Sequence, residues 1–440
     1  MKTSKDRILT THAGSLPRTD KLAKLLIERD NGLPVDEGEM RREVERTTGW
    51  LVAKQLESGV DIASDGEAAR VGFQTYVSLR LSGGWGGVSP RKGMTDIAKF
   101  PKYGEILSKR LGRPGELTAK LFNCYQCQRA VHYQPDLADA KMELRSFAES
   151  LRRNPKKFAE TFVTAASPGI ITTTFLRDED NPDYKTDKDY VFAIAKEMKK
   201  EYDYIVSQGH VLQIDAPDLA MERAFMFQDQ PLGDFLDRIR IHIDALNVAL
   251  ADIPPEKVRL HVCFGNWDGP HIDDVELTPL LPIIYKAKVG AISIASANPH
   301  HQHDWKTLKK NPPPGGMILI PGVIDVTTNY LEHPEVVADR IELFVDVMGG
   351  DRSRVIAGTD CGFSTVAGYM MVAEDVVWAK LRALADGASI ASRRLRRSFG
   401  RSPIKRRSAP KKVRVATHKA RKSAGKIAAR KAAPRRKAKR

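Results

Sequence analysis

The sequence places one imidazole and two thiols where they could share a metal ion. His261 and Cys263 lie two positions apart in a β-type run, 258–263, so both side chains point to one face if this run is a strand. Cys361 follows a second such run, 354–358. One imidazole and two thiolates suit zinc, and three protein ligands leave a fourth position open for a substrate. The alternative interpretation is a buried histidine with two inert core cysteines, since free cysteine is often simply buried.

An open position on such a zinc ion activates thiols. A thiol bound there is strongly favoured as the thiolate, which is the nucleophilic form of sulfur. Alkyl transfer to sulfur at neutral pH needs this activation. The predicted cofactor is therefore Zn²⁺, and the predicted chemistry is attack by the thiolate of a small molecule on an alkyl donor.

Other reactive side chains follow the predicted strands. His12 and Ser15 follow the first, Glu67 follows the second, and Asp215 ends the fourth. Carboxylates can hold an ammonium group, and Ser15 with nearby amides can hold a carboxylate; the alternative for Glu67 and Asp215 is a structural ion pair. His12 is either an acid near the alkyl donor or a hydrogen-bond partner of the strand-end backbone. His12 and Asp215 are the candidate catalytic residues, and Ser15, Glu67 and Asp215 are the candidate substrate-binding residues.

The elements that must position these residues alternate along the chain. Eight β-type runs are separated by stretches with helical spacing, such as 232–250, 275–287 and 334–347, the last of which begins with a first-turn proline. The runs are 7–12, 60–64, 161–165, 211–215, 258–263, 291–295, 317–323 and 354–358. Strands that alternate with helices form parallel sheets. Eight of them favour a closed (β/α)₈ TIM barrel of the α/β class, with the reactive residues at the carboxyl ends of its strands.

Two long segments interrupt the alternation and are predicted to be functional loops. Residues 80–135 contain a Gly-rich turn and are predicted to form a lid or hairpin excursion, and 298–316 is predicted to be a loop. Cys124 and Cys127 have the spacing of a zinc or redox pair. No second cysteine pair accompanies them, so we interpret this pair as structural.

The charge of the chain is concentrated at its end. The chain of 440 residues has a formal net charge of +16, but residues 391–440 hold 22 Lys or Arg and no Asp or Glu. The rest carries 71 − 22 = 49 basic against 55 acidic residues, a net of −6. We predict a barrel domain over 1–390 and a disordered Lys/Arg/Ala-rich tail over 391–440, because the tail has too few large apolar side chains to fold. The tail is either a solvated extension or a sequence-independent binder of polyanions, nucleic acid above all.

Composition excludes several other classes of protein. Four cysteines in 440 residues do not make a disulfide framework. The sequence has neither a signal-peptide pattern nor a run of 18 apolar residues, so we predict a cytoplasmic protein without membrane spans. Neither a P-loop nor a Gly-X-Gly-X-X-Gly motif after a strand is present, which argues against nucleotide chemistry.

Five motifs in order resemble the cobalamin-independent methionine synthase family. They are ILTTHAGSLPR (8–18), DIASDGE (61–67), QIDAP (213–217), HVC (261–263) and GTDCG (358–362). The resemblance is to the catalytic barrel of the family and to its single-barrel relatives, which include epoxyalkane:coenzyme M transferase, and it covers about residues 5–385. It implies a β/α barrel, zinc held by His261, Cys263 and Cys361, and a homocysteine thiol bound to zinc. It also implies that Ser15, Glu67 and Asp215 bind the amino-acid end of homocysteine.

This sequence departs from the family at two points. The family has a glutamate as a further zinc ligand where this chain has Ala295, so water or substrate completes the coordination, or one of His300, His301 and His303 does so. The family enzymes with two barrels use the first to help bind a polyglutamyl folate donor. This chain has one predicted barrel, which leaves the methyl donor open between folate and another compound.

The resemblance predicts a zinc-dependent S-methyltransferase that forms methionine from homocysteine. One alternative is transfer of an alkyl group from an epoxide or another electrophile to a thiol such as coenzyme M. A second alternative is a non-catalytic barrel that its tail tethers to nucleic acid.

Overall fold

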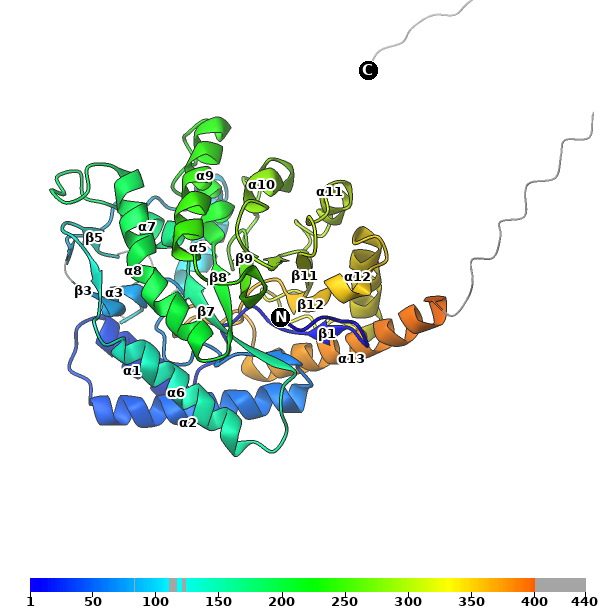
Figure 1. Cartoon of the computed structure of the whole chain (residues 1–440). Helices are drawn as coiled ribbons and strands as arrows, with labels where there is room; N and C mark the ends of the chain where they lie inside the picture. Colours follow the sequence, from blue (N-terminus) through cyan, green and yellow to red (C-terminus); the bar gives the residue numbers. More distant parts are fainter. Residues whose placement is uncertain (83, 111–116, 121–123, 400–440) are drawn as a thin grey trace, which may run out of the picture. The chain divides into compact units, whose positions relative to one another are not determined.

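Eight parallel strands form the centre of the computed structural model, which describes residues 1–82, 84–110, 117–120 and 124–399 (Figure 1). The strands are β1 (Leu9–Thr10), β2 (Ile62–Ala63), β7 (Glu160–Ala166), β8 (Val211–Asp215), β9 (Val258–Val262), β10 (Ala291–Ile294), β11 (Ile318–Ile324) and β12 (Ile356–Thr359). From β2 onwards each of these strands pairs with the next one, and β12 pairs with β1. A parallel bridge between Thr11 and Ile62 joins β1 to β2 and closes the sheet. The predicted (β/α)₈ barrel is confirmed, with a strand at every predicted position.

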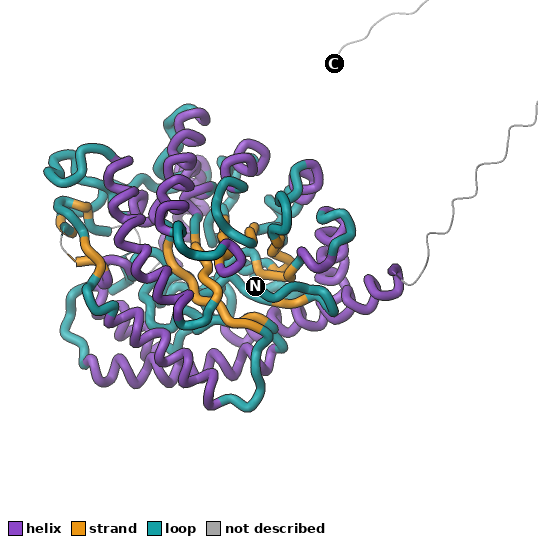
Figure 2. Tube along the Cα trace, viewed as in Figure 1, coloured by secondary structure: helices purple, strands orange, loops and turns teal. Residues whose placement is uncertain are grey.

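Helices surround the strands and also occur in the inserted segment 80–135 (Figure 2). They are α1 (Asp20–Asp30), α2 (Glu37–Ser58), α3 (Val77–Arg80), α4 (Thr95–Lys99), α5 (Pro101–Arg110), α6 (Ala138–Arg153), α7 (Pro168–Thr174), α8 (Asp187–Ser207), α9 (Leu232–Ala249), α10 (Leu277–Ile284), α11 (Trp305–Lys310), α12 (Pro334–Val347) and α13 (Glu374–Phe399). Pro334 occupies the first turn of α12, as predicted, and the His333 side chain accepts a hydrogen bond from the backbone N–H of Glu335. Proline suits this turn because its missing N–H would have no partner inside the helix.

The interior of the barrel changes from apolar to polar along its axis. An apolar cluster fills the amino-terminal end, and six of its eight members are the first residues of their strands. Its members are Leu9, Ile62, Phe162, Val211, Ala291, Ile318, Ile320 and Ile356. The guanidinium of Arg259 lies 3.5 Å from the centre of the Phe162 ring and begins the polar part. The reactive side chains therefore lie towards the carboxyl ends of the strands, where β/α barrels carry their active sites.

Both interruptions of the barrel pattern have structure of their own. Segment 80–135 includes α4, α5 and two small antiparallel sheets. The sheets pair β3 (Leu81–Ser82) with β6 (His132–Tyr133), and β4 (Trp85–Gly86) with β5 (Gln126–Cys127). The segment 298–316 was predicted to be a loop throughout, but it contains the short helix α11.

The predicted start of the tail at residue 391 is wrong, because α13 continues to Phe399. Ala391 is buried, and the Ser392 hydroxyl accepts a hydrogen bond of 2.9 Å from the backbone N–H of Ile8. Arg394 forms an ion pair of 2.8 Å with Asp339 of α12. These contacts attach this end of α13 to the barrel, where Arg394 has acidic partners on α12. The rest of the predicted tail, 400–440, lies outside the described residues.

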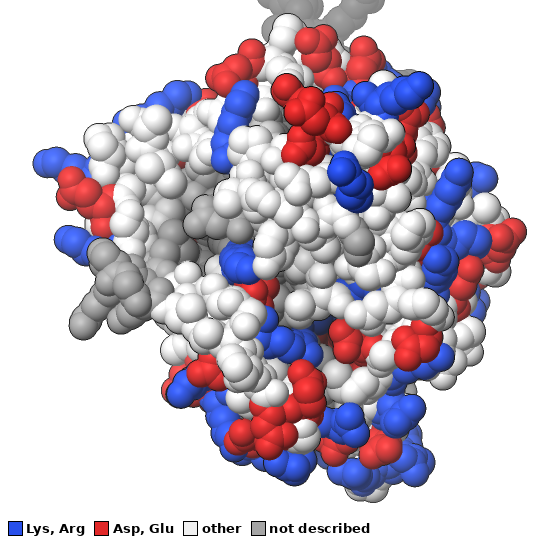
Figure 3. Space-filling view, turned by 90° about the vertical axis from the view of Figure 1, so that its left-hand side faces the viewer, with Lys and Arg blue, Asp and Glu red and all other residues white. Residues whose placement is uncertain are grey.

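The surface of the barrel carries both signs of charge. On the face shown in Figure 3, Lys and Arg alternate with Asp and Glu around a central area of uncharged side chains. Among the residues with described structure, no helix combines the length and the apolar character needed to cross a membrane.

Candidate metal and substrate site

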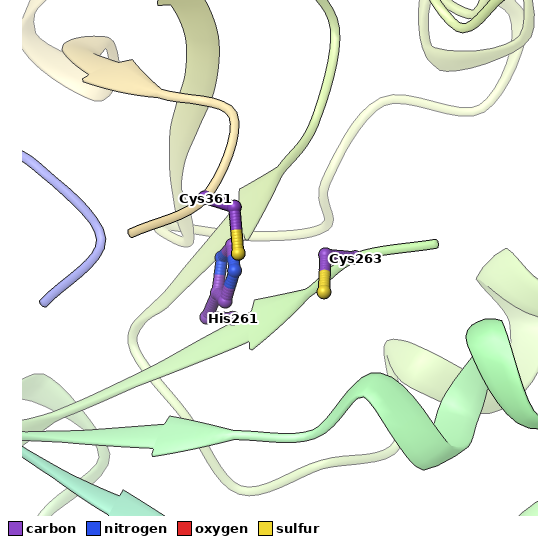
Figure 4. A group of neighbouring side chains, drawn as sticks. All are labelled: His261, Cys263 and Cys361. Carbon is purple, nitrogen blue, oxygen red and sulfur yellow. The ribbon is translucent and has the colours of Figure 1, made fainter. Parts of the chain in front are cut away.

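The structure brings His261, Cys263 and Cys361 together at the carboxyl end of the barrel. His261 lies on β9, Cys263 lies one residue beyond the end of β9, and Cys361 lies in the loop after β12 (Figure 4). A nitrogen of the imidazole and the two sulfur atoms all lie within 4.8 Å of one another. All three residues are buried. Closure of the barrel explains the meeting of β9 and β12 residues that are almost 100 positions apart in the sequence.

The imidazole of His261 has one nitrogen without a partner. Its Nδ1 lies 3.3 Å from the hydroxyl of Ser293 on β10, whereas Nε2 is buried and forms no hydrogen bond. Burying a polar atom without a partner is costly. A metal ion would supply the missing partner, and one nitrogen with two sulfurs is a zinc donor set. The residues present therefore fit a zinc ion.

The two thiols already differ in acidity. A hydrogen bond from the Cys361 thiol lowers the pKa of Cys263 well below its ordinary value, against the effect of burial. The same interaction, together with burial, raises the pKa of Cys361. Burial disfavours the charged imidazolium of His261, but the interaction with Cys263 outweighs it and raises the pKa of His261. Negative charge at the pair thus collects on Cys263, beside the imidazole.

A pocket with a cavity volume of about 120 Å³ lies over these three residues, and Ser15, Glu67 and Asp215 also line it. Ser15 is buried. A Cβ at position 362 would overlap the Ser15 hydroxyl, so this close approach requires Gly362. The structure therefore places all three predicted substrate-binding residues on the same pocket as the predicted zinc ligands.

The two pocket carboxylates are held differently. Glu67 Oε1 accepts a hydrogen bond of 3.0 Å from the Thr164 hydroxyl, whereas Oε2 is buried without a partner. Burial raises the pKa of Glu67, despite the opposing influence of two arginines. Asp215 Oδ1 accepts a hydrogen bond of 2.7 Å from Gln213, and burial, with the nearby charge of Glu67, raises the pKa of Asp215 to about 7. The positive groups of the protein therefore do not fully balance the negative charge of these two carboxylates.

Arg259 lies behind Asp215 and was missed by sequence reasoning. Its Nε donates a hydrogen bond of 2.7 Å to Gln213 Oε1, which turns Gln213 Nε2 towards Asp215. Its other nitrogens donate to the Thr11 hydroxyl and the His12 carbonyl. Arg259 is two residues before His261 on β9, so the period of two along a strand is the signal that could have placed it inside the barrel.

His12 does not line the pocket. Its Nδ1 accepts a hydrogen bond of 3.2 Å from the backbone N–H of Gly14, and its Nε2 lies 2.8 Å from Gln55 Oε1 on α2. Burial lowers the pKa of His12 to about 4, so the ring is neutral at neutral pH. Of the two roles considered for His12, the structure shows the hydrogen bond to strand-end backbone.

Ala295 stands where the family resemblance implies a glutamate ligand to zinc. Ala295 is buried, and the backbone N–H groups of the following residues Ser296 and Ala297 bind the carboxylate of Asp360. His301 binds Asp274 and Asp304 and belongs to a separate cluster. Among the described residues, the group that could hold a metal ion at this position contains His261, Cys263 and Cys361 alone.

The remaining pocket wall is mainly apolar and comes from segments that the sequence did not assign to a site. Segment 80–135 supplies Arg91, Met94 and Leu107, and the loop after β9 supplies Trp267. The length of segment 80–135 predicted a lid or hairpin excursion over the barrel, but no pattern within it indicated which side chains reach the pocket.

Comparisons with known proteins agree with the barrel fold. No model of a known protein family matches the chain. The chain is 26% identical over 358 residues to a methionine synthase of Sulfolobus acidocaldarius, which covers 80% of this chain and 85% of that protein. It is also 26% identical over 233 residues to 2-hydroxypropyl-CoM lyase of Xanthobacter autotrophicus, which covers 47% of this chain and 56% of the lyase. A solved B12-independent methionine synthase from Shewanella sp. W3-18-1, in complex with selenomethionine, has the same fold. Its TM-score is 0.62 at 20% identity, over 89% of this chain and 99% of that one.

The chain is similar in sequence to methionine synthases and in fold to a B12-independent methionine synthase. The resemblance inferred from the five motifs is confirmed, and it extends to a lyase that is named for a coenzyme M thioether.

Proposed function

We propose that the protein is a zinc-dependent enzyme that transfers a methyl group to the thiol of homocysteine. The observation that carries this proposal is the unpartnered Nε2 of His261, which lies beside two thiols at a pocket. Bound zinc would hold and ionise the substrate thiol. The methionine-synthase relatives support the substrate, because their names state the same reaction product.

The residues of the chain supply binding and orientation in this proposal. Glu67 and Asp215 are buried carboxylates whose negative charge the protein does not fully balance, and they would hold the ammonium group of homocysteine. Ser15 would bind its carboxylate. The apolar walls of the pocket would exclude water from the thiolate and hold the alkyl donor in line with it.

The alternative thiol is one without an ammonium group, such as coenzyme M, with an epoxide or another electrophile as donor. The lyase relative and the apolar character of the pocket wall favour this second candidate. The two candidates make different predictions for Glu67→Gln and Asp215→Asn. If the substrate is homocysteine, each change should weaken its binding by roughly 10- to 100-fold, since one charged hydrogen bond contributes about 1.5–3 kcal/mol. If the substrate is a thiol without an ammonium group, such as coenzyme M, each change should leave its binding unchanged.

The first experiment tests the metal site. Cobalt-loaded protein should show the absorption of a thiolate–cobalt bond, and Cys361→Ser should reduce this absorption and the zinc content. Cys127→Ser is the matched control, because it replaces a buried thiol in segment 80–135. Protein that contains no zinc after growth with zinc would overturn both enzymatic candidates and favour the non-catalytic barrel. A panel of methylated folates, methyl thioethers and epoxides would then identify the donor.

The basic tail is a separate proposal. Residues 400–440 hold 18 Lys or Arg and no acidic residue, and we propose that they bind polyanions such as nucleic acid without sequence preference. This binding would not depend on the metal site.

A further inference from the structure

A second group of metal-ligating side chains lies in the loops that follow β9 and β10. It contains His271 and Asp274 from the first loop and His301 from the second. One ligand atom from each residue lies within 4.8 Å of the others. Neither the proposed reaction nor the sequence motifs make use of this group.

Two imidazoles converge on one carboxylate oxygen. His271 Nδ1 lies 2.8 Å and His301 Nε2 lies 2.9 Å from Asp274 Oδ2. The side chains of all three residues are largely buried, with exposed fractions of 13%, 5% and 4% for His271, His301 and Asp274. Both inner nitrogens must carry a proton to bond this oxygen, so one oxygen receives two N–H donors. A divalent cation at the same place would replace both protons.

The outer nitrogen of each ring is held by an acceptor. His271 Nε2 lies 3.1 Å from the carbonyl oxygen of Trp267, and His301 Nδ1 lies 3.1 Å from Asp304 Oδ2. Histidines that bind metals are usually oriented in this way, by a carbonyl or carboxylate on the nitrogen that faces away from the ion. The arrangement thus has both the ligands of a metal site and the outer partners that fix them.

We propose that His271 Nδ1, His301 Nε2 and Asp274 form a second metal site, for a divalent transition metal such as zinc or cobalt. Two imidazoles and one carboxylate suit these ions, whereas calcium and magnesium prefer all-oxygen ligands. His300 lies beside the site, with its ring centre 4.9 Å from that of His301.

The second site would stabilise the wall of the pocket. The His301 ring stacks on Phe264 at 3.7 Å between centres, and Phe264 directly follows Cys263. The His271 ring packs against Trp267, which lines the pocket, at 5.1 Å. A metal ion here would tie the loops after β9 and β10 together behind the first site. Its role is structural and does not depend on the proposed reaction.

Metal titration of the full chain tests the proposal. The protein, stripped with a chelator and titrated with Co²⁺, should bind two equivalents. The double variant Cys263→Ser/Cys361→Ser should keep one equivalent and lose the thiolate–cobalt absorption. His271→Gln and His301→Gln should each keep that absorption but weaken the other equivalent by at least tenfold. Asp304→Asn, which removes only an outer partner, should weaken it by roughly 10- to 100-fold.

Glutamine is chosen because it can still donate a hydrogen bond to Asp274, so the variants should fold. Thermal unfolding of the metal-free proteins would verify this, with His132→Gln, an exposed histidine outside both sites, as the control. One cobalt equivalent in the wild-type protein would overturn the second site. So would a second equivalent whose affinity is the same in both glutamine variants, and the cluster would then be an ion pair network only.

Discussion

At the scale of single residues, the arrangement behind Asp215 depends on one buried guanidinium. Arg259 fixes the orientation of Gln213, and Gln213 donates to Asp215. Arg259→Met removes three hydrogen bonds and leaves Gln213 Oε1 without a partner, so we expect the free energy of unfolding to fall by about 2 kcal/mol. We also expect homocysteine to bind about tenfold more weakly, because Asp215 loses its orientation. Urea denaturation and thiol titration measure the two effects; zinc content should not change. If Arg259→Met binds the thiol as tightly as the wild-type protein, Gln213 orients Asp215 without Arg259.

The pH dependence of stability provides a second test at this scale. Burial alone would lower the pKa of His301, but Asp274 and Asp304 raise it from 6.5 to about 9. The folded state therefore binds the proton more tightly than the unfolded state. The stabilisation is complete below pH 6.5 and is lost as the pH rises through about 9, with a magnitude of at most about 3 kcal/mol.

Urea denaturation of chelator-treated protein across this pH range measures the effect. His301→Gln cannot bind the proton and should lack this part of the pH dependence. If the wild-type protein and His301→Gln show the same pH profile, the ion pair with Asp274 contributes nothing measurable.

At the scale of elements, the end of α13 belongs to the barrel. Truncation after Ile390 removes the Ser392 hydroxyl that binds the backbone N–H of Ile8, and it removes the ion pair between Arg394 and α12. It should lower the free energy of unfolding by at least about 2 kcal/mol, because a buried N–H loses its partner and apolar contacts are lost. Truncation after Phe399 keeps these contacts and should unfold like the full chain. Thermal and urea unfolding of the two truncated proteins distinguish them, and equal stability would contradict the assignment.

The sequence predicted the secondary-structure elements better than the contacts between their loops. The strands were predictable because each is a short apolar run between helices, and the pairing of His261 with Cys263 follows from the two-residue period of a strand. The approach of Cys361 follows once eight strands close into a barrel. Contacts between separate loops were not predictable, as in the meeting of His271 with His301. The end of α13 was misjudged because Arg-rich sequence indicated a tail, whereas acidic partners on α12 were visible only in the structure.

At the scale of the whole molecule, the tail determines the sign of the net charge. Without residues 400–440 the chain has 71 − 18 = 53 basic and 55 acidic residues, a net of −2 instead of +16. Deletion of 400–440 should abolish retention on a DNA column at low salt and leave zinc content unchanged. The full chain should lose DNA affinity steeply with salt, since the logarithm of the binding constant falls by about 0.9 per phosphate contacted for each logarithmic unit of salt. Equal retention of both proteins would contradict tethering by the tail.

The backbone conformation of Glu67 favours one residue type for stability and another for substrate binding. Glu67 has φ of +57°, directly after Gly66 with φ of +71°, and non-glycine residues rarely adopt this left-handed conformation. The site therefore keeps a large acidic residue where the backbone favours glycine or asparagine, at a cost on the order of 1 kcal/mol. A laboratory evolution experiment that rewards heat resistance alone should collect glycine or asparagine at position 67. One in which growth depends on the product that the enzyme forms should restore glutamate there.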